Sequence, residues 1–332
     1  MSEHLLEIND LKVSFFTPAG EVKAVNGVSY DLDEGRVLGI VGESGSGKSV
    51  SVSAMMQLLA YPGRVVGGSI TFNGQDVLAM NTEQIQALRG KDIGMIFQDP
   101  MTSLNPVFTI GEQLVETLRR HTRLSRKEAW DRGIEMLRLV GINNPEQRIR
   151  QYPHEFSGGM RQRAMIAMTL LCNPKLLIAD EPTTALDVTI QAQIMDLMKR
   201  LREKFNAAIT LITHDLGIVS DICDDVIVMY AGRIVERGST DDIFYRPAHP
   251  YTRGLLRCLP RLDSDGSEPL EPIEGTPVDL LALPKGCAFA PRCEKCMKVC
   301  LTQQPPTFPI GEGHTSACWL HAIESQKEVQ QQ

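Results

Sequence analysis

Hydrophobic and polar positions change their spacing along the chain, and this spacing predicts the secondary structure. From about residue 5 to 40, alternating apolar runs such as LLEINDLKVSF and AVNGVSYDL are broken by turn residues at 17–20 and 33–35, which is typical of strands. From about 82 to 170 the spacing is helical, and the segment RKEAWDRGIEMLRLVG ends on Gly141, a candidate C-cap. The chain is therefore predicted to begin with strands and to continue with a helical region.

Short apolar runs return after the helical region. KLLIAD, AAITLITH and DVIVMY each precede helix or turn residues, the alternation expected of a parallel sheet that is covered by helices. After about residue 240 the chain becomes rich in Pro, Gly and Cys, and we interpret the acidic stretch DSDGSEPLEPIEG as a linker into a small tail module. The pattern thus predicts an α/β core, a helical insertion and a C-terminal extension.

Composition narrows the class of protein. A chain of 332 residues with 42% hydrophobic composition can form one large domain and a smaller extension. The formal net charge is -7 and acidic and basic residues are interspersed, so we do not expect nucleic acid as a main partner. The sequence has neither a signal-peptide pattern nor 18 consecutive apolar residues, so we expect no transmembrane segment.

The strongest chemical pattern is GESGSGKS at residues 42–49, directly after the apolar strand RVLGIV. Glycines let such a loop wrap closely around phosphate, while its backbone N–H groups and the following helix N-terminus attract the anion. Lys48 is expected to pair with the β and γ phosphates, and the Ser49 hydroxyl is expected to bind Mg²⁺. The predicted nucleotide-binding residues here are Gly42, Glu43, Ser44, Gly45, Ser46, Gly47, Lys48, Ser49 and Val50.

A second pattern, LLIADEP, places two adjacent carboxylates at the tip of a buried strand. Two carboxylates in such a place are costly unless a cation or hydrogen bonds use them. Asp180 suits the Mg²⁺ shell, and Glu181 has the position of a general base that polarises the attacking water. If these patterns have no chemical role, GESGSGKS is an ordinary Gly/Ser loop and LLIADEP ends in an exposed acidic turn.

The segment SGGMRQR at residues 157–163 resembles the signature motif of ABC ATPases, and few other P-loop proteins carry it. The resemblance covers about residues 5–240. It implies that Phe15 stacks on adenine, that Gln98 touches Mg²⁺ or the water, and that His214 hydrogen-bonds the γ-phosphate. Each of these three alone is more often a turn, core or packing residue. The implied catalytic set is Glu181, His214, Lys48 and Gln98, and a P-loop kinase is disfavoured.

The same resemblance implies a pair of ATPases. The signature loop of one subunit faces the ATP of the other, so Ser157, Gly158 and Gly159 are expected to contact the partner's γ-phosphate. Asp187, which follows Ala185 and Leu186, is expected at the seam between the subunits. The motif departs from its commonest form at Met160, where Gln is usual, and at Phe156, where Leu is usual. Neither change removes a phosphate-facing group.

The expected fold is an α/β P-loop ABC ATPase. It has a RecA-like parallel sheet core, an N-terminal antiparallel β subdomain, a helical signature subdomain and a small Cys-rich C-terminal extension. The ATPase (nucleotide-binding) domain is expected at 5–240, with its helical subdomain at about 99–170. The extension is expected at 241–332, with a Cys-rich module at 287–318.

The segments HPYT and DPMTSLNP resemble those of ATPases from oligopeptide, dipeptide and nickel importers, above all the first ATPase subunit of the peptide systems. This implies a peripheral protein on the cytoplasmic face of the cell membrane that energises import of short peptides. The implied partners are a paralogous second ATPase, two transmembrane permease subunits and an extracytoplasmic solute-binding protein. The surface around residues 99–106 is expected to contact the membrane subunits. Nickel or another small solute is an alternative cargo, and a soluble ABC ATPase without transport is a remote alternative.

Five of the eight cysteines lie between Cys287 and Cys318. In the resembling importers this pattern holds a [4Fe-4S] cluster, which implies the ligands Cys287, Cys293, Cys300 and Cys318 and leaves Cys296 as an extra thiol. By spacing alone, a zinc site or reduced structural thiols remain open. Cys172 and Cys223 are interpreted as small buried hydrophobes, and Cys258 as tail packing.

Overall fold

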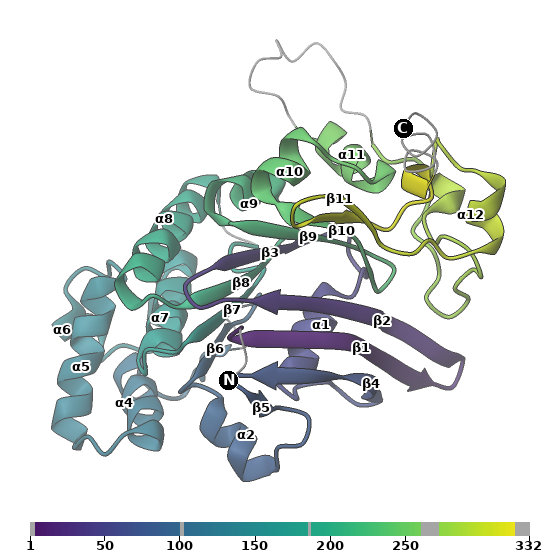
Figure 1. Cartoon of the computed structure of the whole chain (residues 1–332). Helices are drawn as coiled ribbons and strands as arrows, with labels where there is room; N and C mark the ends of the chain where they lie inside the picture. The colour runs from purple at the N-terminus through teal and green to yellow at the C-terminus, as the bar shows by residue number, and fades with distance from the viewer. Residues whose placement is uncertain (1–3, 100–102, 185–186, 260–271, 323–332) are drawn as a thin grey trace, which may run out of the picture. The chain divides into compact units, whose positions relative to one another are not determined.

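The computed structural model describes residues 4–99, 103–184, 187–259 and 272–322, and the chain forms two compact units (Figure 1). The first unit contains Met1–Asp31, Leu38–Leu78 and Thr213–Gln332, and the second contains Leu32–Val37 and Ala79–Ile212. Both therefore combine segments that are distant in sequence. Most of the predicted acidic linker lies outside the described residues.

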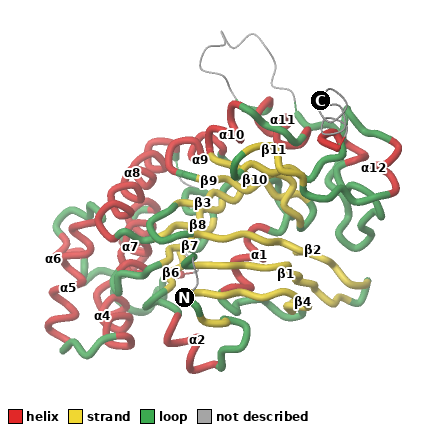
Figure 2. The backbone as a smooth tube through the Cα atoms, viewed as in Figure 1, coloured by secondary structure: helices red, strands yellow, loops and turns green. Residues whose placement is uncertain are grey.

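The first unit contains a four-stranded sheet in the order β2-β1-β4-β5 (Figure 2). Its strands are β1 (Leu6–Thr17), β2 (Gly20–Leu32), β4 (Gly63–Phe72) and β5 (Gln75–Asp76). β1 and β4 are antiparallel, with Leu6 opposite Phe72 and Phe15 opposite Gly63. Along the first part of β1, buried apolar residues alternate with more exposed polar ones, as the period of a strand requires. Helix α1 (Lys48–Met55) packs against β1 and β4.

A second set of strands in the first unit has the order β11-β12-β10-β9-β3. They are β3 (Val37–Val41), β9 (Asp225–Tyr230), β10 (Arg233–Ser239), β11 (Phe308–Gly311) and β12 (His314–Ser316). β3 and β9 are parallel, whereas β10 pairs antiparallel with both β9 and β12. The Cys-rich end of the chain thus extends this sheet. The helices are α9 (Leu216–Ile222), α10 (Thr240–Tyr245), α11 (Pro250–Arg257) and α12 (Lys298–Thr302), with the 3-10 turn η2 (Ala290–Arg292).

The second unit is built on three parallel strands, with β7 between β6 and β8. They are β6 (Ile93–Ile96), β7 (Leu176–Asp180) and β8 (Ala208–Ile212). The helices are α2 (Thr82–Leu88), α4 (Ile110–His121), α5 (Arg126–Leu139), α6 (Pro145–Arg148), α7 (Gly158–Leu170) and α8 (Val188–Phe205), with the 3-10 turn η1 (Pro153–Glu155). Helix α5 contacts α4, α6 and α7, and α7 packs on β6. β8 is buried at every position, as expected of a strand covered on both faces.

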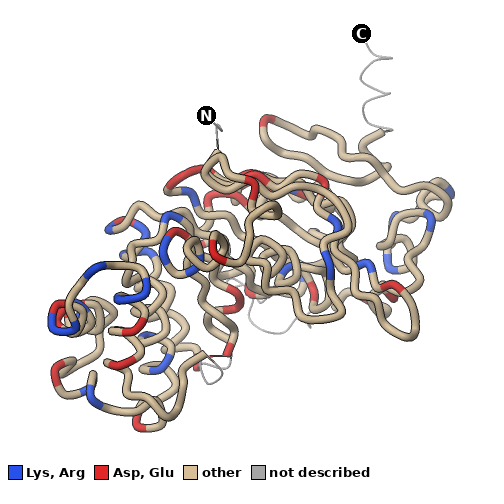
Figure 3. Tube along the Cα trace, turned by 90° about the horizontal axis from the view of Figure 1, so that it is seen from below, with Lys and Arg blue, Asp and Glu red and all other residues tan. Residues whose placement is uncertain are grey.

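The helix boundaries follow local signals. α4 and α5 each begin with a reciprocal capping box, Thr109 with Glu112 and Ser125 with Glu128. Gly141, at φ 79°, follows the end of α5, which confirms the predicted stop. Among the described residues, no helix is long and apolar enough to cross a membrane. Lys and Arg alternate with Asp and Glu along the described trace (Figure 3).

The strands expected at KLLIAD, ITLIT and DVIVMY are present as β7, β8 and β9. Two details differ from the spacing-based prediction. β6 lies inside the range predicted as helical, because a four-residue apolar run such as IGMI carries too little periodicity to reveal a strand. β9 is followed by a tight turn at Ala231 and Gly232, both with positive φ, and then by β10, which is antiparallel to it, whereas the pattern predicted a parallel sheet.

Candidate nucleotide site

The loop between β3 and α1 has a positive φ at three glycines, a conformation that favours glycine. Gly42, Gly45 and Gly47 have φ values of 148°, 78° and 99°. A Cβ at Gly42 would lie 2.2 Å from the Met229 carbonyl oxygen, and one at Gly47 would lie 2.3 Å from the Ala24 carbonyl oxygen. Around Gly45, in contrast, nothing lies within 4 Å of an added Cβ. The glycines thus wind the loop tightly against the fold and leave open space on one side.

Lys48 is the first residue of α1 and its side chain is buried. Its Nζ donates hydrogen bonds to the carbonyl oxygens of Gly42 (2.7 Å) and Glu43 (3.0 Å), which fixes the ammonium group over the loop. The Ser46 hydroxyl is buried and has no hydrogen-bond partner within the described part of the chain. A positive charge and a helix N-terminus at one glycine loop make a site for an anionic phosphate group.

The predicted catalytic carboxylate lies in the second unit, at the carboxyl ends of two neighbouring strands. β6 and β7 are parallel with Ile96 opposite Ala179, so the residues that follow each strand meet. Gln98 Nε2 donates to Glu181 Oε2 at 3.0 Å, and Thr184 Oγ1 donates to the same oxygen at 2.9 Å. The two donors hold one oxygen of the carboxylate. Sequence reasoning did not include Thr184, because no motif distinguishes it from a turn residue.

Glu181 also has an unusual backbone. Its φ of 47° lies in the left-handed region, which is uncommon for a side chain of this size. Its N–H donates to the Ile212 carbonyl oxygen at 2.8 Å, which keeps the residue beside the end of β8. Asp180, the last residue of β7, is half-buried. Such local strain at a strand tip is typical of functional positions.

The signature loop opens helix α7 in the second unit. Ser157 is the N-cap, and its Oγ accepts from the Met160 N–H at 3.4 Å. Ser157 and Gly158 are exposed, whereas Phe156 beside them is buried and anchors the loop. The exposed N-terminus of a 13-residue helix carries a partial positive charge that favours an anion.

Three further predicted residues occupy separate places. Phe15 is half-buried near the end of β1, with its ring against Gly63. His214 belongs to the first unit and is exposed. Asp187 is the N-cap of α8, and its Oδ1 accepts from the Ile190 N–H at 3.0 Å. This cap accounts for Asp187 within the chain itself, while the neighbouring residues 185–186 lie outside the described ones.

The four predicted cluster cysteines line one small cavity together with Phe289 and His249. Burial raises the pKa of Cys287 and of Cys318 to about 11, and it also raises the pKa of Cys293. Thiolates are the ligands that iron–sulfur clusters and zinc use, so the donor type fits either group. Among the described residues, however, no group of three or more Cys, His, Asp or Glu is arranged to hold a metal ion.

The remaining cysteines are all free thiols. Cys223 is buried, half-buried Cys172 has a pKa raised by burial, and Cys258 Sγ contacts the Gly254 carbonyl oxygen at 3.2 Å inside the C-terminal extension. Exposed Cys296 lies at the surface of the module. The structure therefore places these thiols outside the cavity of the other four.

Comparison with known proteins identifies the family. Residues 25–184 match the ABC transporter family, and residues 235–300 match the oligopeptide/dipeptide transporter C-terminal region. The oligopeptide transport ATP-binding protein OppD of Salmonella typhimurium is 56% identical over 315 residues, covering 95% of this chain and 93% of the relative. The dipeptide transport ATP-binding protein DppD of Bacillus subtilis is 53% identical over 328 residues, covering 98% of each. The chain belongs to the ABC transporter family of ATP-binding proteins.

Solved ABC cassettes have the same fold. The dimeric ATP-binding cassette MJ0796, in a post-hydrolysis state bound to ADP and Pi, matches with a TM-score of 0.64 at 25% identity, covering 71% of this chain and 98% of that chain. The cassette cbiO1 from Clostridium perfringens, part of the ABC transporter complex cbiONQ, matches with a TM-score of 0.63 at 28% identity, covering 73% and 91%. This chain therefore has the ABC ATPase fold with mixed α/β sheets.

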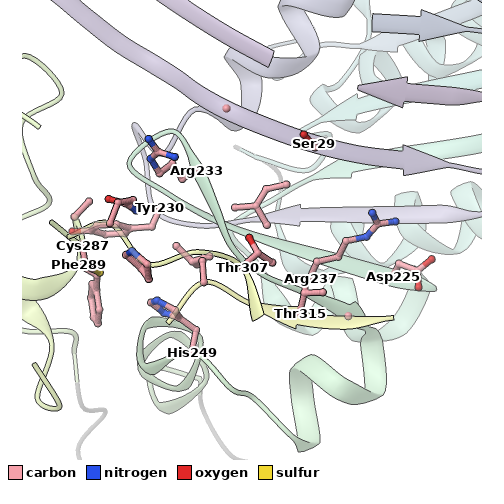
Figure 4. A pocket seen from close by; sticks show the side chains of 18 of the residues that line it. Ser29, Asp225, Tyr230, Arg233, Arg237, His249, Cys287, Phe289, Thr307 and Thr315 are labelled. Carbon is pink, nitrogen blue, oxygen red and sulfur yellow. The ribbon is translucent and has the colours of Figure 1, made fainter. Parts of the chain in front are cut away.

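A separate cavity of about 540 Å³ lies in the first unit of this ABC ATPase, beside β9, β10 and the Cys-rich extension (Figure 4). Tyr230, Arg233 and Arg237 line it from the sheet, and Phe289 and Thr315 line it from the extension. Among the predicted site residues, Cys287 lines this cavity. The predicted nucleotide residues do not line this cavity.

Proposed function

We propose that this chain is the ATP-hydrolysing subunit that energises import of short peptides through an ABC transporter. The observation that carries the proposal is sequence identity. Over nearly its whole length, this chain is more than 50% identical to proteins named as oligopeptide and dipeptide transport ATP-binding proteins. The match of residues 235–300 to the C-terminal region of such transporters supports the same cargo class. Transport of nickel or another small solute remains the alternative, and uptake of labelled dipeptides, oligopeptides and nickel by the assembled complex distinguishes them.

The proposed hydrolytic chemistry follows from the two loops. Lys48 pairs with the β and γ phosphates, and Ser49, Gln98 and Asp180 supply the oxygen ligands that Mg²⁺ prefers. Mg²⁺, when bound, neutralises charge on the phosphates. Glu181 accepts a proton from the attacking water. The hydrogen bonds from Gln98 and Thr184 to one Glu181 oxygen support this role, because they orient the carboxylate.

The other predicted residues complete a clamp of two subunits. Phe15 stacks on adenine and His214 contacts the γ-phosphate. Ser157, with Gly158 and Gly159, contacts the ATP of a second, paralogous ATPase, and Asp187 lies at the seam. The exposed start of α7 supports this assignment, because an anion from outside the chain can approach it. ATP binding closes the pair and hydrolysis reopens it, which moves the membrane subunits.

The proposed organisation is an ATPase domain at 5–240, with a RecA-like core, an antiparallel β subdomain and a helical subdomain at about 99–170. A C-terminal extension at 241–332 follows. The protein is placed peripherally on the cytoplasmic face of the membrane, with two permease subunits and an extracytoplasmic solute-binding protein as further partners. The surface around 99–106 is the proposed permease contact, although 100–102 lie outside the described residues.

The first test is Glu181→Gln in the assembled complex, compared with wild type. Removal of the general base should lower hydrolysis at this site by at least about a hundredfold while ATP stays bound. Nucleotide occupancy after a chase with unlabelled ATP checks that the ATP is trapped. Unchanged hydrolysis at this site would contradict the assignment of Glu181. Retention of ATP by the wild-type chain tests the broader claim that it is a nucleotide-binding subunit.

We also propose that Cys287, Cys293, Cys300 and Cys318 hold a [4Fe-4S] cluster, with zinc as the alternative. Their position around one cavity supports a shared ligand. Anaerobically purified protein should contain about four iron atoms per chain and absorb visible light. Cys287→Ser should lose the iron, whereas Cys296→Ser, at the exposed thiol, should keep it. Zinc without iron, or neither metal, would contradict the cluster.

A further inference from the structure

Arg292, in the Cys-rich extension, is bonded to the predicted phosphate loop. It lies in the turn η2, directly before Cys293. Its Nη1 donates to Glu43 Oε2 at 2.6 Å and its Nη2 donates to Glu43 Oε1 at 2.9 Å, which makes a bidentate ion pair. The Arg292 side chain is only 4% exposed and that of Glu43 is 28% exposed. A paired and buried guanidinium of this kind is among the stronger polar contacts in proteins.

The surroundings fix Arg292 in this orientation. Its Nη2 and Nε also donate to the carbonyl oxygens of Ile273 (3.2 Å) and Glu274 (3.0 Å). Its Nη1 also donates to Tyr230 Oη at 3.5 Å, and the guanidinium lies 5.9 Å from the centre of that ring. All of these residues belong to the first unit. Besides Glu43, the Arg292 guanidinium therefore contacts two parts of the chain, residues 273–274 of the extension and Tyr230 of β9.

The extension also holds the backbone of the same loop residue. The Glu43 N–H donates to Tyr251 Oη at 2.8 Å, and Tyr251 lies in α11 with its side chain buried. The Tyr251 ring packs against Tyr230 (4.7 Å between centroids) and Phe289 (5.3 Å). The C-terminal extension thus holds Glu43 in two ways: Arg292 binds its side chain, and Tyr251 binds its main chain.

Glu43 places a carboxylate inside the loop that is predicted to bind phosphates. An unpaired negative charge there repels the anionic nucleotide. Arg292 removes this repulsion, because it neutralises Glu43 within hydrogen-bond distance. It also fixes the Glu43 carboxylate in one orientation. Glu43 directly follows Gly42, whose backbone begins the loop.

We propose that Arg292 is a positioning residue of the ATP site, which neutralises and holds Glu43 so that the phosphate loop keeps its affinity for nucleotide. The proposal rests on the proposed function, because it concerns the same nucleotide site. The Cys-rich extension would then contribute directly to ATP affinity. Arg292 itself has no predicted contact with nucleotide and acts through Glu43.

The experiment measures equilibrium affinity for ATP in the full-length chain, without hydrolysis. Arg292→Gln leaves the Glu43 charge unpaired, so ATP binding should weaken about tenfold. Adding Glu43→Gln to this variant removes the charge again and should restore the affinity to within about threefold of wild type. Glu43→Gln alone is a poorer probe, because it leaves Arg292 buried without its anion. Rescue by a second substitution separates charge neutralisation from simple loss of structure.

Two further variants control the result. Arg257→Gln breaks the more exposed pair with Glu294 in the same extension (3.0 Å) and should leave ATP affinity unchanged. Arg292→Lys keeps the positive charge but loses the bidentate pair and the hydrogen bonds to Ile273 and Glu274, so its ATP affinity should lie between those of wild type and Arg292→Gln. Thermal unfolding of every variant is measured beside binding.

The outcomes are distinguishable. The proposal is overturned if Arg292→Gln binds ATP as tightly as Arg257→Gln, or if the double variant stays as weak as Arg292→Gln. In each of these cases wild-type ATP binding and the trapping of ATP by Glu181→Gln still support the proposed function. If the wild-type chain itself binds no ATP, the proposed function fails instead.

Discussion

Two glycine-containing loops of this protein use glycine for different reasons. In the phosphate loop, Gly42 and Gly47 have positive φ values, and a Cβ on either would lie within 2.3 Å of a backbone oxygen of β2 or β9. In the signature loop, Gly159 has helical backbone, and the nearest atoms to an added Cβ belong to the Ile190 side chain, the first at 2.9 Å. The first loop needs glycine for its own fold. The second could accommodate alanine with a small shift of one side chain.

The difference indicates why glycine is present in each loop. Gly42 and Gly47 are explained by the chain alone, since only glycine fits their conformation. Gly159 is not, because its helical backbone also suits alanine. Ser157 is explained in part, since it is the N-cap of α7 and serine is a preferred N-cap residue. In the proposed pair of ATPases, Gly159 leaves room for a phosphate that approaches from outside the chain. On that proposal, glycine has a conformational role in the phosphate loop and a recognition role in the signature loop.

The largest expected effect is on the phosphate loop. Gly47→Ala should lower the free energy of unfolding by about 3 kcal/mol, because it combines an unfavourable φ of 99° with a backbone clash. ATP binding should be lost with it. Chemical denaturation and equilibrium ATP binding by the full-length chain measure the two effects.

Gly45→Ala is the matched control in the same loop. Gly45 also has positive φ, but an added Cβ meets nothing within 4 Å, so the cost should be strain alone, about 1 kcal/mol. Equal destabilisation by both variants would show that the backbone clash at Gly47 is relieved by a shift. The conformational argument for that glycine would then fail.

Gly159→Ala tests the signature loop. Its stability should change by less than about 1 kcal/mol, because alanine favours helix and only Ile190 must adjust. ATP hydrolysis by the assembled complex should nevertheless fall at least about tenfold, because the methyl group occupies the approach of the partner's phosphate. Denaturation of the isolated chain and steady-state hydrolysis by the complex are compared.

Either of two results would break the comparison. If Gly159→Ala destabilises the chain as much as Gly47→Ala, the signature glycine also has a conformational role. If hydrolysis stays at the wild-type rate, no phosphate approaches the start of α7. A normal ATP affinity of the variant's own phosphate loop is the internal control, since Gly159 belongs to the other unit.

Sequence alone predicts the parts of this site that are adjacent along the chain. The GESGSGKS loop predicts Lys48 at the start of a helix after a strand, and the structure has that order. The pairing of Gln98 with Glu181 follows less directly, since it depends on β6 and β7 being parallel neighbours. Sequence spacing does not predict Arg292 beside Glu43, because the contact joins residues 249 positions apart. Such contacts depend on how the extension packs.

The smallest expected effect compares the N-cap serine of the signature loop with another N-cap serine. Ser157 accepts a single long hydrogen bond, 3.4 Å, from Met160 N–H, whereas Ser239 forms a reciprocal capping box with Asp242 and donates to its Oδ2 at 2.6 Å. Ser239→Ala should therefore lower the free energy of unfolding by about 1 kcal/mol, and Ser157→Ala by only a few tenths, about 0.3 kcal/mol.

Hydrolysis by the assembled complex should follow the opposite order. Ser157→Ala removes a hydroxyl that the partner's γ-phosphate is expected to contact, so it should slow hydrolysis by about tenfold, whereas Ser239→Ala should leave the rate nearly unchanged. If stability and hydrolysis fall together in both variants, the Ser157 hydroxyl serves only to cap α7. If they separate as expected, the poor hydrogen-bond geometry of Ser157 within its own chain is explained by a partner that the isolated subunit lacks.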